Sequence, residues 1–176
     1  MKHICTFGHA LYHSPVGELC LVSGGDSLLM CDWTASARHQ DNLSRLSLTT
    51  ADLQELSATA PIVRATEWLE AYFSRVALSE MPEMPALNPV GTPFQRDVWR
   101  ALLSLRRGTT VSYTRLAAMA AHPSAVRAVA SAIASNPLSI FIPCHLVTRS
   151  DGSTGNYAGS PATKRLLIDL EQSSNP

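Results

Sequence analysis

The residues with the clearest chemical potential are Cys144 and His145, which follow the apolar segment 140–142 and Pro143. A cysteine attacks through its thiolate, which forms near neutral pH only beside a cation, a histidine or a helix N-terminus. We expect segment 140–142 to be a short buried strand that ends at this pair. Neighbours in sequence need not face each other, so the Cys-His pair alone is weak support for an activated thiol.

Residues on both sides of this pair supply polar groups that could fold toward the thiol. Asn136 lies upstream, and the downstream loop 152–159 carries Tyr157 among small residues. The last predicted helix, 161–171, ends in Glu171, whose negative charge opposes the helix dipole. That position is unfavourable for the helix alone, which indicates a separate role for the carboxylate.

The other three cysteines, Cys5, Cys20 and Cys31, form no CxxC pair and no close cluster with histidines. Each alternates with apolar residues in a strand-like stretch. We therefore expect them to be buried, reduced thiols without catalytic function.

Charge is unevenly divided along the chain, although the net charge is 0. Residues 1–94 hold 5 basic and 10 acidic side chains, whereas residues 95–176 hold 9 basic and 4 acidic ones. A basic half favours a polyanionic partner, but it can also dock on an acidic half. With 45% hydrophobic residues and no apolar run near the roughly 20 residues of a membrane helix, we expect a cytoplasmic globular protein, nuclear in a eukaryote, with no membrane partner.

The first half of the chain predicts a small antiparallel sheet. Segments 3–12, 18–23 and 27–33 have strand character, and turn-forming residues separate them. The polar segment that follows offers at most a short helix near 51–58. Apolar residues at helical spacing then predict one clear helix over 62–77.

A linker with four prolines, 80–93, separates this part from the rest. We therefore predict an N-terminal α/β domain with strands and one helix over 1–90, and a mostly helical C-terminal domain over 91–176. The fold class is α+β.

Three helices are predicted after the linker, over 93–105, 113–121 and 124–134, with Ser112 as the cap of the second. The last two, joined by a tight turn, form a helix-turn-helix pattern. Helix 124–134 consists of small residues with one charge, Arg127, so it is either an ordinary buried helix or a smooth surface for nucleic acid. It lacks the polar side chains that read base edges, which favours close, sequence-independent contact.

These motifs together closely resemble the O6-alkylguanine-DNA alkyltransferase family over about 91–171, and more loosely over the N-terminal part. The matching segments are Thr92-Pro93-Phe94-Gln95, Val98-Trp99, Ser112-Tyr113, Arg127-Ala128-Val129, Asn136-Pro137, Ile142-Pro143-Cys144-His145-Leu146-Val147, Gly155-Asn156-Tyr157-Ala158-Gly159, Leu166-Leu167 and Glu171, with Ser14-Pro15-Val16-Gly17 and Trp68-Leu69-Glu70-Ala71-Tyr72-Phe73 in the N-terminal part.

The resemblance implies direct-reversal DNA repair, in which the alkyl group of O6-alkylguanine moves irreversibly, once per molecule and without a cofactor, to Cys144. O4-alkylthymine is a candidate second substrate. His145 and Glu171 would form a relay that holds the thiol proton through a water, and Asn136 would brace the turn beside the thiol. Tyr113 would donate a proton or a hydrogen bond to the departing base.

The resemblance also implies that a monomer binds double-stranded DNA through the minor groove without sequence specificity. The damaged nucleotide would be flipped out, at a cost of a few kcal/mol, and Arg127 would fill the vacated space. The remaining expected contacts are Ala125, Ala128 and Ser131 with DNA, and Val147, Tyr157 and Ala158 with the guanine.

Three positions depart from the family pattern. Leu146 replaces an arginine, which removes a cation and a salt bridge near the site. Ala130 adds a methyl group where the recognition helix usually has glycine. Ala158 replaces a serine of some members but keeps a backbone N–H donor. We expect activity to persist, with DNA affinity or the pKa of Cys144 altered.

Zinc-binding members of the family carry Cys and His ligands in the N-terminal part. Only Cys5 matches such a position here, while Gly24 and Leu29 occupy two others. We therefore expect no structural metal.

Three other functions compete with alkyl transfer. Alkyltransferase-like proteins bind the same lesion but have Trp instead of the reactive cysteine, so Cys144 favours transfer. A helix-turn-helix regulator would need polar base-reading residues on 124–134. A cysteine hydrolase would turn over repeatedly and would need a Gly-rich oxyanion loop, which is missing.

Overall fold

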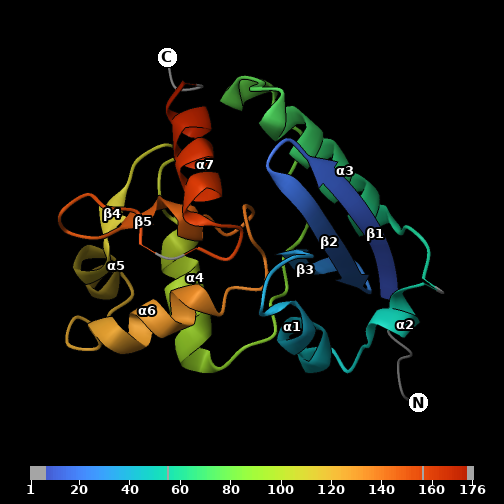
Figure 1. The fold of residues 1–176 in the computed structure, drawn as a ribbon, viewed down its shortest axis with the longest axis horizontal. Coiled ribbons are helices and arrows are strands. Elements are labelled where there is room, and N and C mark those ends of the chain that lie inside the picture. The colour runs from blue at the N-terminus through green and yellow to red at the C-terminus, as the bar shows by residue number, and fades with distance from the viewer. Residues whose placement is uncertain (1–6, 55, 156, 174–176) are drawn as a thin grey trace. The chain divides into compact units, whose positions relative to one another are not determined.

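The computed structural model describes residues 7–54, 56–155 and 157–173. Contacts divide the chain into two compact units, Met1–Val90 and Gly91–Pro176. The first contains a three-stranded antiparallel sheet and the second is mostly helical, which confirms the α+β class (Figure 1).

The sheet of the first unit is the expected meander of β1 (Phe7–Ser14), β2 (Gly17–Gly24) and β3 (Ser27–Trp33). The β1–β2 turn requires Gly17, because its φ of +128° is a conformation that other residues rarely adopt. The Ser14 hydroxyl donates to the Gly17 carbonyl at 2.6 Å and closes this turn.

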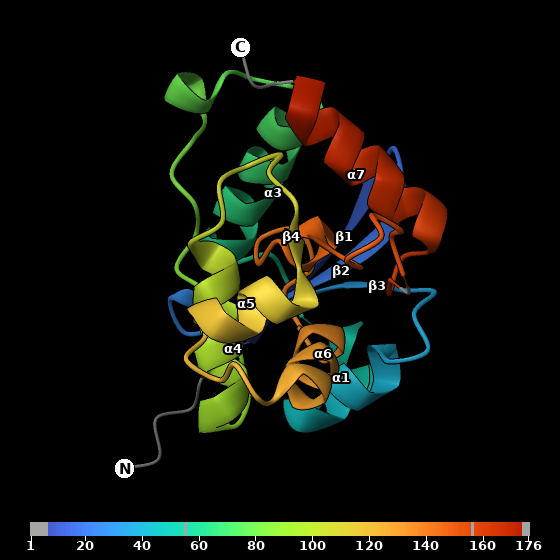
Figure 2. The same cartoon turned by 90° about the vertical axis from the view of Figure 1, so that its left-hand side faces the viewer.

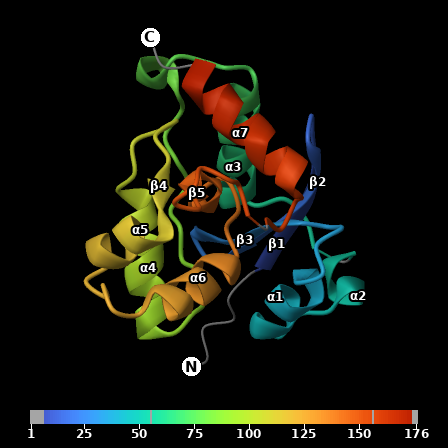
Figure 3. The ribbon, with the colours of Figure 1, turned by 60° about the vertical axis from the view of Figure 1, so that its left-hand side comes forward.

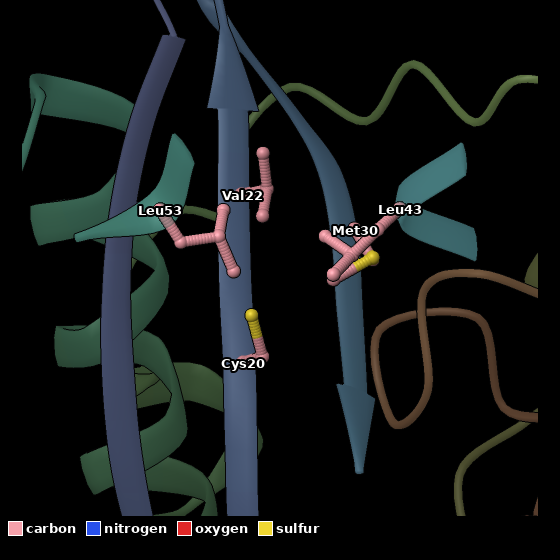
Figure 4. Packing of buried hydrophobic residues seen from close by; sticks show 5 residues of the cluster. All are labelled: Cys20, Val22, Met30, Leu43 and Leu53. Atoms are coloured by element: carbon pink, nitrogen blue, oxygen red, sulfur yellow. The ribbon is translucent and has the colours of Figure 1, made fainter. Parts of the chain in front are cut away.

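One face of the sheet carries Cys20 and Val22 from β2 and Met30 from β3. They pack with Leu43 of α1 (His39–Arg45) and Leu53 of α2 (Thr50–Leu53), as Figure 4 shows. Side chains of a strand alternate between faces, so Leu19, Leu21 and Cys31 lie on the opposite side. Helix α3 (Ala60–Phe73) packs on the sheet through a buried stripe, consisting of Ile62, Ala65, Leu69 and Tyr72.

The helices of this unit differ from the prediction of one main helix over 62–77. Helix α3 ends at Phe73, because Arg75 takes a left-handed φ of +58°. Helix α2 is a single turn, closed by a capping box between Thr49 and Asp52. Helix α1 was not predicted, because its one large apolar residue gives no periodic pattern.

Polar contacts hold α1 where apolar periodicity is lacking. The buried carboxylate of Asp32 accepts from Asn42 Nδ2 of α1 at 2.7 Å and from the Trp33 N–H at 2.8 Å. A buried carboxylate is costly unless such donors surround it, so this contact fixes the helix to β3.

The proline-rich linker is not a loose connection over its whole length. After a short 3₁₀ turn, η1 (Leu78–Glu80), the chain runs alongside the start of β3. The Leu28 N–H donates to the Ala86 carbonyl at 2.8 Å, and the Asn88 N–H donates to the Leu28 carbonyl at 2.9 Å. These bonds attach this part of the linker to the first unit.

The second unit is built on α4 (Pro93–Leu103), α5 (Tyr113–Met119) and α6 (Val126–Ala134), which pack against one another (Figures 2 and 3). The indole N–H of Trp99 in α4 donates to the Ala132 carbonyl of α6 at 2.9 Å. This bond satisfies a buried donor and fixes how α6 lies against α4.

Helices α5 and α6 form the predicted helix-turn-helix. The turn between them passes through Ala121 with a φ of +63°, and the His122 N–H closes it by donating to the Ala117 carbonyl at 2.8 Å. Helix α6 buries Val129, Ala132 and Ile133. Its exposed residues are Arg127 and three small ones, Ala128, Ser131 and Ala134.

The expected strand over 140–142 is wrong. Ile140 has a left-handed φ of +72°, so the chain turns here and the Ile142 N–H donates to the Leu138 carbonyl at 2.9 Å. Buried turns can be as apolar as strands, so composition does not separate the two.

The chain then forms a 3₁₀ turn, η2 (Cys144–Leu146), and β5 (Val147–Thr148). Strand β5 pairs in parallel with β4 (Val111–Ser112). The last helix, α7 (Pro161–Ser173), contacts η2.

The Ser112→Ala variant tests the cap at the start of α5. The Ser112 hydroxyl accepts from the Arg115 N–H at 3.1 Å, so its loss should lower the free energy of unfolding by about 1 kcal/mol. Urea denaturation measures the change. Thr114→Ala, at an exposed position on the same helix, is the control and should change stability much less. Equal losses would show that the cap does not stabilise α5.

Candidate functional site

The thiol of Cys144 lies at the start of η2 and is 7% exposed. Asn136 Nδ2 donates to its Sγ at 3.2 Å and to the Ile142 carbonyl at 2.9 Å. Asn136 Oδ1 accepts from the Leu138 N–H at 3.0 Å. The amide thus closes the buried turn and points a donor at the sulfur, and such a bond favours the ionised form of the thiol.

His145 and Glu171 form a buried pair, with exposed fractions of 0% and 3%. His145 Nε2 and Glu171 Oε1 are 2.7 Å apart. The second oxygen of Glu171, Oε2, accepts from the Gly108 N–H at 2.8 Å. An ionised carboxylate accepts the Nε2 proton, which leaves Nδ1 with the lone pair. That atom is buried and has no hydrogen-bond partner in the described residues.

Gly108 was not predicted as part of the site. It has a φ of +73°, and a methyl group added to it would lie 3.0 Å from the backbone oxygen of Glu171. Gln172 Nε2 also donates to the Gly108 carbonyl at 3.3 Å. Glycine is therefore required twice, for the backbone conformation and for the close approach to α7. A glycine after the predicted helix 93–105 was the only sequence signal for this position.

Tyr113 begins α5 and is half-buried. Burial raises its pKa and the charge of Cys144 raises it further, while Arg149 lowers it. The phenol therefore keeps its proton at neutral pH. A methyl group on Gly155 would lie 3.6 Å from the Tyr113 hydroxyl, which places the loop 152–155 beside the tyrosine.

Lys164 was also missed by the sequence analysis as a site residue. It is 1% exposed, and its ammonium donates to the carbonyls of Val147 and Thr154. Burial lowers its pKa, the charge of Cys144 opposes this shift, and Arg149 adds to it. Lysine so rarely lies buried that only its contacts, and not its sequence context, reveal this role.

Of the three residues expected to contact the guanine, Val147 and Tyr157 contact residues of the site, Lys164 and His145. Val147 is buried, and its carbonyl already accepts from Lys164. The ring of Tyr157 lies edge-on to that of His145, with centroids 6.5 Å apart. Ala158 is exposed, and Asn156 of the matching motif lies outside the described residues.

The residues expected to contact DNA lie on or just before α6, and the chain then continues from Ala134 through Ser135 to Asn136. Arg127, Ala128 and Ser131 are exposed, and Ala125, which caps the helix, is half-buried. The helix thus ends two residues before the amide that touches the sulfur.

Besides Ala158, the two other departures from the family pattern are Leu146 and Ala130. Leu146 is 0% exposed. An arginine at this position would have to extend its charge out of an apolar site. Ala130 is half-buried, so its methyl group lies at the edge of the exposed face of α6.

The cysteines of the sheet are poor nucleophiles, as expected. Burial, reinforced by the charge of Asp32, raises the pKa of Cys20 to about 12 and raises that of Cys31 well above its usual value. Both thiols therefore stay protonated near neutral pH. Cys5 lies outside the described residues. Within residues 7–54, 56–155 and 157–173, no three His, Cys, Asp or Glu side chains are grouped to hold a metal ion.

The fold and the site define a protein with a helix-turn-helix and a buried cysteine in the same unit, and comparisons with known proteins identify its family. Residues 93–173 match the family model of the 6-O-methylguanine DNA methyltransferase DNA-binding domain. Residues 8–82 match the model of the ribonuclease-like domain of the same methyltransferase. The chain therefore belongs to the 6-O-methylguanine DNA methyltransferase family.

Curated relatives and a solved structure agree with this membership. The methylated-DNA–protein-cysteine methyltransferase of Cricetulus griseus is 38% identical over 97% of this chain and 85% of that protein. The Mus musculus protein of the same name is 49% identical, but the match covers only 63% of this chain and 55% of that protein. The structure of Mycobacterium tuberculosis OGT in complex with DNA is 32% identical, with a TM-score of 0.79 over 96% of this chain and 95% of that chain.

In the part of the chain that the structure describes, no helix is both long enough and apolar enough to cross a membrane.

Gly108→Ala tests the close approach between this glycine and α7. The left-handed φ alone should cost about 1–2 kcal/mol, and the contact with the Glu171 backbone should add to it. Gly152→Ala is a matched control, because its φ of +81° is similar but no atom lies within 4 Å of the added methyl group. Urea denaturation of both variants should show the larger loss for Gly108→Ala, and equal losses would contradict the role of the contact.

Proposed function

We propose that this protein repairs DNA directly, by moving the alkyl group of O6-alkylguanine onto Cys144 in a reaction that each molecule performs once. The observation that carries the proposal is the set of contacts around one sulfur. Asn136 donates to the thiol, and the residue after the thiol, His145, is bonded to the buried Glu171. Family membership and the names of the relatives support the same reaction.

The thiol is activated by removal of its proton. His145 Nδ1 carries the lone pair that can accept this proton, directly or through a water, because Nε2 donates to Glu171. The imidazolium that forms is then stabilised by a carboxylate 2.7 Å away. The hydrogen bonds from His145 and from the Gly108 N–H both favour the ionised form of Glu171.

The thiolate attacks the alkyl carbon in line with the bond to O6. A carbon–sulfur bond forms, the carbon–oxygen bond breaks, and its electron pair stays on the guanine. Tyr113 is suited to donate a hydrogen bond or a proton to the departing base, because its phenol carries a proton at neutral pH. Neutralising the leaving guanine lowers the barrier to this step.

Access to the sulfur requires that the nucleotide leave the DNA stack, because Cys144 is nearly buried. We propose that α6 lies in the minor groove and that Arg127 fills the vacated space. The small exposed side chains of α6 allow a close approach, and none of them can read base edges in detail. Binding is therefore expected to be independent of sequence, with a monomer as the active species and no metal or cofactor.

Cys144→Ser should abolish transfer and leave binding to undamaged DNA largely intact, because a hydroxyl group is hardly ionised near neutral pH. The measurement uses DNA with labelled O6-methylguanine and intact-mass spectrometry of the protein. The native chain should gain one alkyl group per molecule, with product never exceeding protein. Cys31→Ser is the control and should react normally. Transfer to another cysteine, or multiple turnovers, would contradict the proposal.

Arg127→Ala should slow repair of duplex DNA by at least tenfold, since unstacking a base costs a few kcal/mol, but should not slow reaction with free O6-benzylguanine. The rates of alkylation of Cys144 on the two substrates measure this difference. Arg165→Ala, which removes another exposed arginine from the same unit, is the control and should leave both rates unchanged. Equal losses on both substrates would show that Arg127 supports folding instead of base extrusion.

A further inference from the structure

The loop after β5 carries a cation that the proposed chemistry does not use. Arg149 is exposed, and its guanidinium has no hydrogen bond or ion pair to the described residues. Two other arginines of this unit have partners, since Arg100 pairs with Asp97 at 3.2 Å and Arg96 donates to the Gly91 carbonyl. Arg149 is thus free to bind an anion from outside the protein.

The backbone of this loop is held in a closed turn. The Arg149 N–H donates to the Ser153 carbonyl at 2.9 Å, and the Gly152 N–H donates to the Arg149 carbonyl at 2.9 Å. The buried Lys164 bonds the carbonyls of Val147 and Thr154, on either side of the turn. The position of Arg149 is therefore fixed before any ligand arrives, which reduces the entropy lost on binding.

The acidic residue nearest in sequence does not neutralise Arg149. Asp151 Oδ1 accepts from the Ser153 N–H at 2.9 Å, inside the same turn. Hydrogen bonds from the Ser153 side chain and from its N–H, more than the charge of Arg149, lower the pKa of Asp151. The carboxylate thus stabilises the turn and leaves the guanidinium to the solvent.

Arg149 lies beside the reactive centre. A methyl group on Gly155 would be 3.7 Å from Arg149 Nε and 3.6 Å from the Tyr113 hydroxyl, so both side chains are neighbours of this glycine. Burial lowers the pKa of Lys164, and the charge of Arg149 adds to this shift, so Arg149 also acts on this buried side chain. The cation therefore stands at the solvent edge of the site whose interior holds Cys144.

We propose that Arg149 binds the phosphodiester group next to the extruded nucleotide, an inference that rests on the function proposed above. When a base enters a buried site, its phosphates must stay at the solvent edge, where an exposed guanidinium can reach them. Guanidinium and phosphate form paired, charge-assisted hydrogen bonds. Such a contact positions the nucleotide and carries no sequence information. Unlike Arg127, Arg149 should act on single-stranded DNA as well as on duplex DNA.

The test compares alkylation rates of Cys144 in the native chain, Arg149→Gln and the control Arg165→Gln. The substrates are free O6-benzylguanine, a single-stranded oligonucleotide with one O6-benzylguanine, and the same oligonucleotide with uncharged methylphosphonates on both sides of the lesion. Arg149→Gln should react normally with the free base and roughly tenfold more slowly with the oligonucleotide, the loss expected for one charge-assisted contact near water. With methylphosphonates, the native chain and the variant should react equally.

Salt dependence gives a second readout. The slope of log affinity against log salt for single-stranded DNA should fall by about 0.7 in Arg149→Gln, because one phosphate contact is lost. An unchanged rate on the oligonucleotide, an equal loss on the free base, or a loss that persists with methylphosphonates would overturn the proposal. If the native chain alkylates Cys144 with none of the three substrates, the proposed function itself fails.

Discussion

The buried carboxylate of Glu171 is the constraint on which the second unit depends. An ionised carboxylate that is 3% exposed is tolerable only if hydrogen-bond donors surround it. His145 supplies one donor and the Gly108 backbone supplies the other, from segments far apart in the sequence. Helix α7 therefore cannot move away from η2 or from the Gly108 turn without leaving a charge unpaired. The same contact that gives His145 its basic Nδ1 thus also fixes the architecture around the thiol.

Lys164 is a second buried residue that can carry a charge, and its partners differ in kind from those of Glu171. Lys164 bonds two backbone carbonyls and no carboxylate, so burial lowers its pKa. A negative charge on Cys144 opposes that shift, so a thiolate at this position and the ammonium would stabilise each other. Asn136 adds a neutral donor to the sulfur. Under the proposed function, alkylation removes the charge of the sulfur and leaves Lys164 without it. The site is therefore built for the thiolate and not for the product.

The sequence predicted the side chains with distinctive chemistry better than the backbone that holds them. The grouping of Cys144, Asn136, His145 and Glu171 followed from a motif, and Glu171 also stood out because it opposes its helix dipole. Gly108 acts through its N–H, which every residue except proline possesses, so the glycine signals a turn but not the bond to Glu171. The two-residue strands β4 and β5 are too short to show periodicity. Segment 140–142 shows the converse failure, because an apolar turn and an apolar strand have the same composition.

The charge distribution of the second unit shows why net charge is weak support for a DNA partner. Arginines can bond to groups of the protein itself. Arg96 donates to a backbone carbonyl in this way, and Arg100 forms an ion pair with Asp97. The guanidinium groups of Arg127 and Arg149 do neither among the described residues, and they lie on different elements, one on a helix of small residues and the other on a closed loop. An exposed guanidinium that forms no ion pair keeps more of its attraction for phosphate than one held in a surface ion pair. The support that the basic half gives for a DNA partner therefore comes from its unpaired arginines and from the elements that hold them, not from its net charge.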